Sequence, residues 1–318
     1  MKKTLVTGGA GFIGSHVVER LLEEGDRVVA YDDLSTGFLR HLDAARRSPR
    51  FRFVKGNLRD ERRLRAAMKG CGSVVHLAAN ADVRFGLRHP ERDLEENTRG
   101  TFRVLEAMRA CGAKEILFSS TGSVYGEPAV FPTPEDAPFP RQTSLYGASK
   151  LAGEALISAY CEGFGLRGRV FRFVSILGER YSHGHVFDFC RKLLADPRRL
   201  ELLGDGRQRK SYLHVGDCVS ALLLARRRAK APFEVFNLGV DDWCTAEQSA
   251  RWIAARMGLK PRITRTGGRR GWVGDSPFIF LDARRIRRLG WKPRLGIRES
   301  VHRTLDWLLE NRWILDRR

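Results

Sequence analysis

An α/β fold with a doubly wound parallel sheet, followed by a smaller mixed α/β C-terminal lobe, is what the sequence predicts. Segments rich in Val, Ile, Leu and Phe alternate with segments of helical spacing through the first half of the chain. A glycine-rich turn, TGGAGFIG at residues 7–14, joins the first strand-like segment to the first helical one. An acidic residue, Asp32, ends the next strand-like segment. Together these observations indicate a Rossmann-type arrangement.

The individual elements follow in the order that such a sheet requires. A helix is expected at 14–25, where apolar residues have helical spacing and a glycine ends the pattern. From about 176 the chain changes to loops and arginine-rich helices. One helix, at 245–258, opens with a capping box formed by Thr245 and Gln248. The other expected helices lie at 281–293 and 297–310, and the expected strands lie at 3–9, 26–33, 51–60, 71–79, 113–120, 166–178 and 233–239.

Composition and length exclude several classes of protein. The 318 residues, 42% of them hydrophobic, are enough for a large core. No apolar run approaches the ~20 residues of a membrane span, and Gly8 and Gly9 end the N-terminal apolar stretch too early for a signal peptide. The six cysteines show no CxxC spacing, and HGH at 183–185 has no supporting ligand cluster. We therefore expect a cytoplasmic protein without disulfides or a metal site.

The formal net charge of +20 is the most unusual feature of the composition. A polyanion partner is one interpretation of such a charge. However, only 11 of the 57 basic residues are lysine, and the charges are spread along the chain. This pattern favours an arginine-rich composition over a nucleic-acid surface. We expect neither a nucleic-acid nor a membrane partner.

The glycine-rich turn predicts a phosphate site. Gly8, Gly11 and Gly14 have GxxGxxG spacing, and glycine lets the chain turn sharply while a pyrophosphate approaches the helix N-terminus. The carboxylate of Asp32 suits the ribose hydroxyls of NAD and would repel the 2′-phosphate of NADP, and Asp33 adds to that repulsion. The sequence therefore predicts NAD as the cofactor, bound by a domain of residues 1–175 and 211–239.

A second motif, YGASK at 146–150, supplies candidate catalytic groups. Lys150 lies one helical turn after Tyr146, so its ammonium would lie close to the phenol. A nearby cation favours the phenolate, as does the positive charge of NAD+. Tyr146 would then act as a general base near neutral pH, although free tyrosine titrates near ~10.

Taken in order, TGGAGFIG, HLAA (76–79), SSTGSVYG (119–126) and YGASK resemble the extended short-chain dehydrogenase/reductase family. Within it, the chain is most similar to the NAD-dependent epimerases/dehydratases, and among these to the UDP-glucose 4-epimerase-like nucleotide-sugar epimerases. The resemblance runs from residue 2 to about 310. It implies a nucleotide diphosphate sugar, with a UDP-sugar favoured, as the partner, bound by a lobe of residues 176–210 and 240–318.

The resemblance also implies which residues form the site. The catalytic residues would be Thr121, Tyr146 and Lys150. The residues in contact with NAD would be Gly8, Gly11, Phe12, Ile13, Gly14, Asp32, Asp33, Leu34, Ser35, Gly37, Asn57, Leu58, Leu77, Ala78, Ala79, Asn97, Ser119, Tyr146 and Lys150. Those in contact with the substrate would be Thr121, Ser123, Tyr146, Ser175, His185, Val186, Arg209, Lys210, Arg270 and Asp275.

The reaction favoured by the sequence is 4-epimerisation through a 4-keto sugar. Similar 4,6-dehydratases carry an Asp–Glu pair directly after the active-site threonine, and similar decarboxylases carry a Glu there. This chain has Gly122 and Ser123 after Thr121, without a carboxylate. A reductase, or an epimerase acting at C2 or C3/C5, stays open as an alternative. A noncatalytic NAD-binding protein and a nucleic-acid-binding protein of the same fold are further alternatives.

Several residues depart from the pattern of the similar enzymes. Asn57 follows Gly56 where an Asp is usual, Ser175 stands where an Asn meets the substrate, and Lys210 stands where an Arg binds the diphosphate. Lysine offers a point charge and not a bidentate fork. An RPGD-like motif is replaced by RRGWVGD at 269–275. We also expect a homodimer, because helices near 93–111 and 147–162 correspond to a pair that forms a four-helix interface in similar enzymes.

Overall fold

The computed structural model describes residues 2–138, 141–272, 275–276 and 278–317. The chain forms two compact units, each built from three separate segments. The first unit comprises Met1–Val124, Ser144–Arg172 and Val219–Phe236, and the second comprises Tyr125–Thr143, Phe173–Cys218 and Asn237–Arg318.

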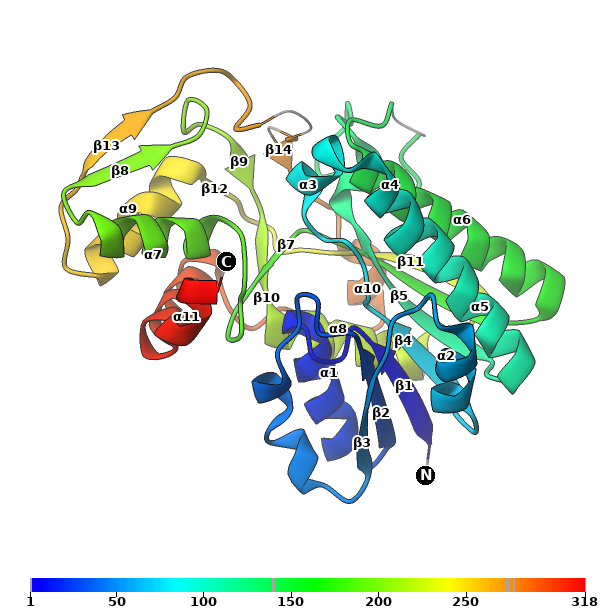
Figure 1. Cartoon of the computed structure of the whole chain (residues 1–318). Helices are drawn as coiled ribbons and strands as arrows, with labels where there is room; N and C mark the ends of the chain where they lie inside the picture. The colour runs from blue at the N-terminus through cyan, green and yellow to red at the C-terminus, as the bar shows by residue number, and fades with distance from the viewer. Residues whose placement is uncertain (1, 139–140, 273–274, 277, 318) are drawn as a thin grey trace. The chain divides into compact units, whose positions relative to one another are not determined.

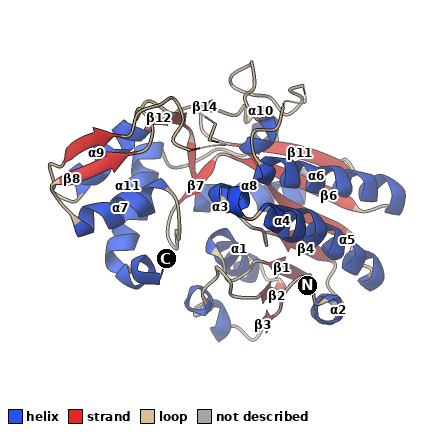
Figure 2. Cartoon of the chain, turned by 45° about the horizontal axis from the view of Figure 1, so that its top comes forward, coloured by secondary structure: helices blue, strands red, loops and turns tan. Residues whose placement is uncertain are grey.

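A seven-stranded sheet forms the centre of the first unit, and it confirms the predicted Rossmann-type fold. Its strands lie in the order β11-β6-β5-β4-β1-β2-β3, and the four pairs from β5 to β3 are parallel. Figure 2 shows the strands in red between blue helices. The strands are β1 (Lys3–Thr7), β2 (Arg27–Asp32), β3 (Phe51–Lys55), β4 (Ser73–His76), β5 (Glu115–Thr121), β6 (Arg167–Phe173) and β11 (Phe233–Leu238).

Helices connect these strands, as a parallel sheet requires. The expected helix at 14–25 is α1, and the long helices α5 and α6 lie side by side along the sheet (Figure 1). The helical segments are α1 (Phe12–Glu23), η1 (Leu39–Leu42), η2 (Ala45–Arg47), α2 (Glu61–Met68), α3 (Val83–Arg88), α4 (Pro90–Arg92), the π-helical η3 (Asp93–Arg99), α5 (Gly100–Cys111), η4 (Gly122–Tyr125), α6 (Leu145–Phe164) and α8 (Val215–Arg228).

The hydrophobic core of this unit lies between strands and helices that are far apart in the sequence. Leu5, Val74 and Ile116 from neighbouring strands are completely buried, as are Val104 from α5 and Ile157 from α6. The near-continuous apolar runs of the central strands are thus explained by burial on both faces of the sheet.

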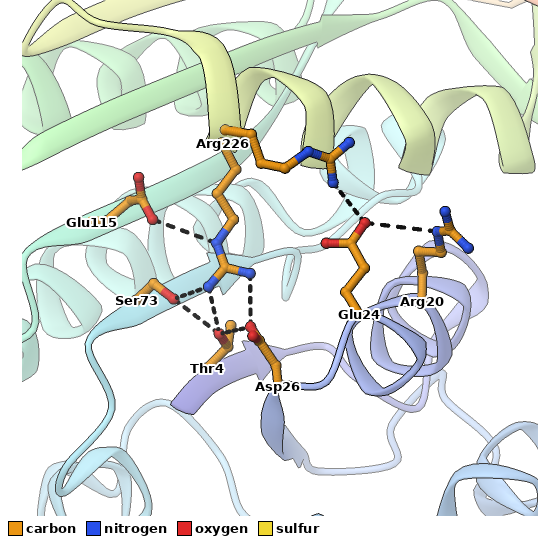
Figure 3. A network of polar contacts seen from close by, with 8 residues as sticks. Thr4, Arg20, Glu24, Asp26, Ser73, Glu115 and Arg226 are labelled. Atoms are coloured by element: carbon orange, nitrogen blue, oxygen red, sulfur yellow. Dashed lines mark hydrogen bonds and ion pairs between the residues drawn. The ribbon is translucent and has the colours of Figure 1, made fainter. Parts of the chain in front are cut away.

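A buried polar network ties α8 to the amino ends of four strands, β1, β2, β4 and β5 (Figure 3). Arg226 donates hydrogen bonds to Asp26 Oδ2 (2.8 Å), Thr4 Oγ1 (3.1 Å) and Ser73 Oγ (3.1 Å). Its Nε also lies 3.5 Å from Glu115 Oε2. The side chain of Arg226 is only 4% exposed. One guanidinium therefore neutralises two buried carboxylates, a role that its position in the sequence did not suggest.

The second unit combines short strands with three longer helices. The capping box predicted for its helix at 245–258 is confirmed: Thr245 Oγ1 accepts from Gln248 N (3.0 Å), and Gln248 Oε1 accepts from Thr245 N (2.8 Å). Its elements are β7 (Ser175–Leu177), α7 (His185–Ala195), β8 (Arg199–Leu202), β9 (Arg209–Lys210), β10 (Tyr212–His214), β12 (Cys244–Thr245), α9 (Ala246–Arg256), β13 (Arg262–Arg265), β14 (Phe278–Ile279), α10 (Arg284–Arg288), α11 (Ile297–Glu310) and η5 (Arg312–Arg317).

The two units differ from the expected domains in four segments: residues 125–143, 173–175, 211–218 and 237–239 lie in the second unit. Residues 125–143 were expected with the sheet but belong to the second unit. Asn237 explains this grouping, because its Nδ2 donates to Thr133 O (2.9 Å) and its Oδ1 accepts from Tyr125 Oη (2.8 Å). In the part of the chain that the structure describes, no helix combines the length and hydropathy that a membrane crossing needs.

Candidate functional site

The glycine-rich turn has a geometry that only glycine allows at two of its positions. Gly8 has a φ of +68°, and a Cβ there would lie 2.8 Å from the backbone nitrogen of Ala78. A Cβ on Gly14 would lie 2.0 Å from the carbonyl oxygen of Gly8. Gly11 caps α1 without any side-chain hydrogen bond, so the first amides of the helix stay available to an anion. The turn therefore fits the pyrophosphate of a dinucleotide.

Asp32 lies at the carboxyl end of β2 and holds the neighbouring loops together. Its Oδ2 accepts from Ala10 N (2.9 Å), and its Oδ1 accepts from Leu34 N (2.8 Å). Burial raises the pKa of this carboxyl, and the two backbone hydrogen bonds oppose the rise. A Cβ on Gly37 would lie 3.0 Å from Oδ1, so glycine there keeps the carboxylate uncovered. A carboxylate placed beside the turn in this way fits the ribose of NAD.

The unusual Asn57 is explained by its neighbour Asp33. Asn57 Nδ2 donates to Asp33 Oδ2 (2.7 Å), and Asn57 Oδ1 accepts from Arg59 N (2.9 Å). Burial alone would raise the pKa of Asp33, but hydrogen bonds from Ser35 and Asn57 lower it below its usual value. An aspartate at 57 would set two carboxylates against each other. The amide instead fixes the loop that begins at Asp33.

The predicted catalytic pair lies in the first two turns of α6. Ser144 caps this helix, because its Oγ accepts from Gly147 N (3.0 Å). Lys150 is 2% exposed, and its Nζ lies 4.5 Å from the centre of the Phe118 ring. Burial lowers the pKa of Lys150 to about 7, and the charge of Glu154 opposes this shift.

The phenol of Tyr146 is a weaker acid in this structure than the sequence suggested. Burial raises its pKa to about 12, and the charge of Asp93 adds to the rise. A hydrogen bond with Thr121 works in the opposite direction. A lowering by the neighbouring Lys150, which the sequence suggested, is not among the effects on this phenol. Without further positive charge, the phenol stays protonated at neutral pH.

Thr121 lies at the phenol, and Ser123 lies beside Thr121. Thr121 ends β5, and its hydroxyl accepts from Ser123 N (3.1 Å) and donates to Ser123 Oγ (3.2 Å). Together with its bond to Tyr146, this links the Thr121 hydroxyl both to the candidate acid–base group and to Ser123. Neither Gly122 nor Ser123 supplies a carboxylate.

Asn97 was predicted as a cofactor contact, but its side chain holds the catalytic helix in place. Its Nδ2 donates to Ser149 Oγ (2.9 Å), and Ser149 Oγ donates to the carbonyl oxygen of Tyr146 (2.8 Å). Asn97 Oδ1 accepts from Asn80 N (2.8 Å), and Asn80 Nδ2 donates to Asp93 Oδ1 (2.9 Å). Asn80, Asp93 and Ser149 were not predicted. Only their position between recognised motifs could have drawn attention to them.

His76 is a second group that the sequence did not single out. Its Nδ1 lies 2.7 Å from Thr7 Oγ1, and its Nε2 lies 3.1 Å from Thr101 Oγ1. Burial lowers the pKa of His76 to about 3, so the imidazole is neutral. Its role is structural, because the ring joins Thr7 to Thr101. The predicted contacts Leu77 and Ala78 directly follow it and lie against the glycine-rich turn, where Leu77 N donates to Thr7 O (3.1 Å).

The other predicted cofactor contacts also lie in the first unit. Ser35 and Gly37 follow β2, Leu58 lies after β3, and Ser119 Oγ donates to His76 O (3.3 Å). The remaining ones are near the same loops: Phe12 and Ile13 open α1, and Ala79 follows β4.

The predicted substrate residues of the second unit are already engaged with other protein groups. Lys210 Nζ donates to Asp275 Oδ1 (2.6 Å) and to Ser276 O (2.5 Å). The side chain of Asp275 is 2% exposed, so this pair is a buried salt bridge. The positive charge of Lys210 is therefore neutralised by Asp275. In the RRGWVGD segment, Val273 and Gly274 lie outside the described residues.

Arg209 and Arg270 make different kinds of contact, one with aromatic rings and the other with a carboxylate. The guanidinium of Arg209 lies 4.1 Å from the centre of the Phe278 ring and 5.0 Å from that of Trp243. Both contacts are of the cation–π kind. Arg270 forms an ion pair with Glu127, and both side chains are exposed.

The remaining predicted contacts differ in their exposure. Ser175 is exposed at the start of β7, which pairs in parallel with β10. His185 Nε2 lies 2.8 Å from Ser249 Oγ, and burial lowers the pKa of His185 to about 3, so the ring is neutral. Val186 is completely buried in α7, which leaves its side chain no access to a ligand in this structure.

The chain is similar in sequence and in fold to NAD-dependent epimerases and dehydratases. The model of the NAD dependent epimerase/dehydratase family matches residues 4–239. A UDP-glucose 4-epimerase of Mycolicibacterium smegmatis is 34% identical over 312 residues, covering 96% of this chain and 98% of the relative. A solved UDP-galactose 4-epimerase is 37% identical with a TM-score of 0.88, covering 98% of this chain and 100% of that one.

Two further solved structures carry ligands. A UDP-glucose 4-epimerase from Thermotoga maritima with UDP-glucose is 33% identical, has a TM-score of 0.88 and covers 97% of this chain and 99% of that one. A dTDP-glucose 4,6-dehydratase from Streptomyces venezuelae with NAD bound is 28% identical, has a TM-score of 0.89 and covers 98% of both chains. Similarity of the whole fold therefore does not separate epimerase from dehydratase. The chain belongs to the NAD dependent epimerase/dehydratase family, and NAD is its cofactor.

Proposed function

We propose that this protein is a nucleotide-sugar 4-epimerase that acts on a UDP-sugar. The observation that carries the proposal is the cluster of Thr121, Tyr146 and Lys150, in which a threonine hydroxyl bonds the phenol and an ammonium is buried one turn away. Relatives and solved structures with 33–37% identity that are named UDP-glucose or UDP-galactose 4-epimerases support it.

Each group of this cluster has a role that follows from its position. Tyr146 takes the proton of the sugar 4-hydroxyl and later returns it, and Thr121 holds the same oxygen. Bound NAD supplies the hydride acceptor and, in its oxidised form, a positive charge. For Tyr146 to act as a base near neutral pH, its pKa must fall from about 12, and the positive charge that oxidised NAD brings would add to that of Lys150 in lowering it.

Elimination of water is the main competing reaction, because a 4,6-dehydratase has the same fold. Such a reaction needs an acid–base group for the carbon next to the ketone and for the departing hydroxyl. Gly122 and Ser123, which follow Thr121, offer no carboxylate for this task. We therefore propose that the 4-keto sugar is reduced again and leaves as the epimer.

A product assay tests the proposed function. Purified protein incubated with UDP-glucose and NAD should produce UDP-galactose, which ¹H NMR distinguishes by the sugar C4 signal. Formation of a 4-keto-6-deoxy sugar would contradict the proposal and show that the protein catalyses elimination. Net accumulation of NADH would indicate a dehydrogenase instead.

Arg209 and Arg270 are the groups that we propose for the diphosphate. Their positive charges are less buried than that of Lys210, and Arg270 has an exposed partner, Glu127, that a phosphate can displace. Lys210 would contribute mainly by holding Asp275.

We also propose that the protein is a cytoplasmic homodimer formed through α5 and α6. The six cysteines are free, as is usual in a reducing compartment. Phe102 on α5 and Leu145 and Phe164 on α6 are 44–45% exposed, an unusual position for large apolar side chains. Light scattering at micromolar concentration should show twice the 36.0 kDa of the chain. A species of 36.0 kDa alone would contradict the dimer.

A further inference from the structure

Glu154 stands in an unexpected relation to the catalytic lysine. It lies one turn after Lys150 on α6, and residues four apart on a helix face each other. Both are buried, with exposed fractions of 2% for Lys150 and 4% for Glu154. A buried ammonium and a buried carboxylate at this spacing would be expected to pair. No ion pair joins these two described residues.

The carboxylate is instead held by β5 and β6. Arg172 Nε donates to Glu154 Oε1 (3.1 Å) and Oε2 (3.2 Å), and Arg172 Nη2 donates to Oε2 (2.7 Å). Ser120 Oγ also donates to Oε1. Both oxygens of Glu154 are thus bound by groups of the sheet.

The surroundings of Lys150 show what this arrangement achieves. Its Nζ lies over the Phe118 ring and has no carboxylate partner among the described residues. The charge of Glu154 still acts on Lys150 from a distance and opposes the effect of burial. The titratable or charged groups around this ammonium are Tyr146 and Glu154 from α6, neutral His76 from β4, Asp93 from η3, which acts on Tyr146, and Arg172 from β6.

We propose that Arg172 is a positioning residue for Lys150: it holds Glu154 against the sheet and so keeps the ammonium out of a salt bridge along its own helix. The lysine then keeps its pKa of about 7, and its donors are not taken up by a bond to Glu154. If Arg172 were absent, Glu154 would lose three hydrogen bonds. Lys150, one turn earlier on the same helix, would then be the cation nearest to its carboxylate. The inference rests on the role proposed for Lys150 in the reaction.

The pKa of Lys150 tests this proposal directly. In protein carrying ¹³C-labelled lysine, the εCH₂ signal of Lys150 is assigned by its loss in Lys150→Met and followed from pH 5 to 11. In Arg172→Met, a new pair with Glu154 should raise the pKa of Lys150 by about one unit or more. In Glu154→Gln/Arg172→Met, the carboxylate charge is gone, so the pKa should fall below the wild-type value.

Two further variants separate positioning from structural damage. Arg226→Met breaks another buried arginine–carboxylate cluster in the same unit and should leave the pKa of Lys150 unchanged. Arg172→Lys keeps one charge and should give a smaller rise. If neither single variant at Arg172 folds, the proposal is tested by the pKa of Lys150 in Glu154→Gln/Arg172→Met, which leaves no unpaired charge.

An unchanged pKa in folded Arg172→Met, or a wild-type pKa in the double variant, would overturn the proposal. The titration needs no turnover. A failure of the proposed epimerisation would therefore leave it intact, and an unchanged pKa would leave the proposed reaction untouched.

Discussion

The Tyr146 phenol shows at the scale of one residue how burial and charge compete. Its pKa of about 12 describes a group that keeps its proton at neutral pH, and an added positive charge would favour the phenolate that can act as a base. Tyr146→Phe keeps the ring and removes the proton. Turnover should fall by ~10³-fold or more while the affinity for NAD stays nearly the same, measured by steady-state kinetics and by calorimetry. Activity within tenfold of wild type would exclude Tyr146 as the acid–base group.

Lys150 should lower the stability of the fold that carries it. Its pKa is lowered from 10.5 to about 7, so below pH 7 the folded protein keeps an ammonium buried at a cost. Between pH 7 and 10.5 the unfolded chain binds more protons than the folded one, and the stability contributed by this residue rises with pH. At pH 6, the free energy of unfolding of Lys150→Met should therefore be higher than that of the wild type by about 1 kcal/mol or more.

Urea unfolding of both proteins at several pH values checks this expectation. The advantage of Lys150→Met should shrink as the pH rises through 7 toward 10, because the wild-type lysine becomes neutral. An advantage that stays constant with pH would mean that packing, and not charge, distinguishes the two proteins.

Lys210 offers a third test, because the structure gives it a different partner from the one that the sequence suggested. Lys210→Ala leaves the carboxylate of Asp275 buried without its cation and should lower the free energy of unfolding by about 2–4 kcal/mol. Lys210→Ala/Asp275→Asn removes both charges and should recover much of this loss. If Lys210→Ala instead weakens UDP-sugar binding at full stability, the lysine serves the diphosphate.

At the scale of the elements, the α8 cluster of Figure 3 tests how the sheet is anchored. Arg226→Met removes the partner of Asp26 and Glu115, which lie at the amino ends of strands. Breaking such a buried cluster should cost about 3–5 kcal/mol in the free energy of unfolding. Since the predicted catalytic residues lie at the carboxyl ends of strands or on α6, the KM of the folded variant should stay unchanged. A large change in KM with unchanged stability would contradict this separation.

The elements that the sequence predicted well are those whose pattern is local. The alternation of apolar strands and helices in the first unit is one example, and α9 with its capping box is another, because Thr245 and Gln248 interact with each other. The segment 166–178 was expected as one strand, but it divides into β6 and β7, which pair in different sheets. Two-residue strands such as β9 exist only through partners distant in the sequence, so no local pattern reveals them.

The site was predictable to a similar degree. Motif spacing was enough to propose Gly8, Asp32, Tyr146 and Lys150 as site residues, because phosphate binding and proton transfer demand those residue types in that order. Partners such as Arg172 could not be found, because they depend on which buried groups meet. Lys210 was placed by its motif, but its bond to Asp275 is a property of the folded chain.

At the scale of the whole molecule, part of the arginine charge behind the net charge of +20 is paired with carboxylates. Many arginines take part in surface ion pairs, such as Arg256 with Asp306 (2.9 Å) and Arg251 with Glu247 (2.7 Å). Exposed pairs of this kind contribute only about 0–1 kcal/mol each and leave the excess charge to solvent.

The central claim, epimerisation at C4, is tested most directly by the fate of hydrogen in heavy water. UDP-glucose is incubated with the protein in D₂O, and the products are examined by ¹H NMR. The hydrogen removed from C4 should return to the same carbon, so we expect UDP-galactose with its C4 proton intact and without deuterium at C5 or C6. A 4-keto-6-deoxy product labelled with deuterium at C5 or C6 would contradict the account, since elimination draws hydrogen from the solvent.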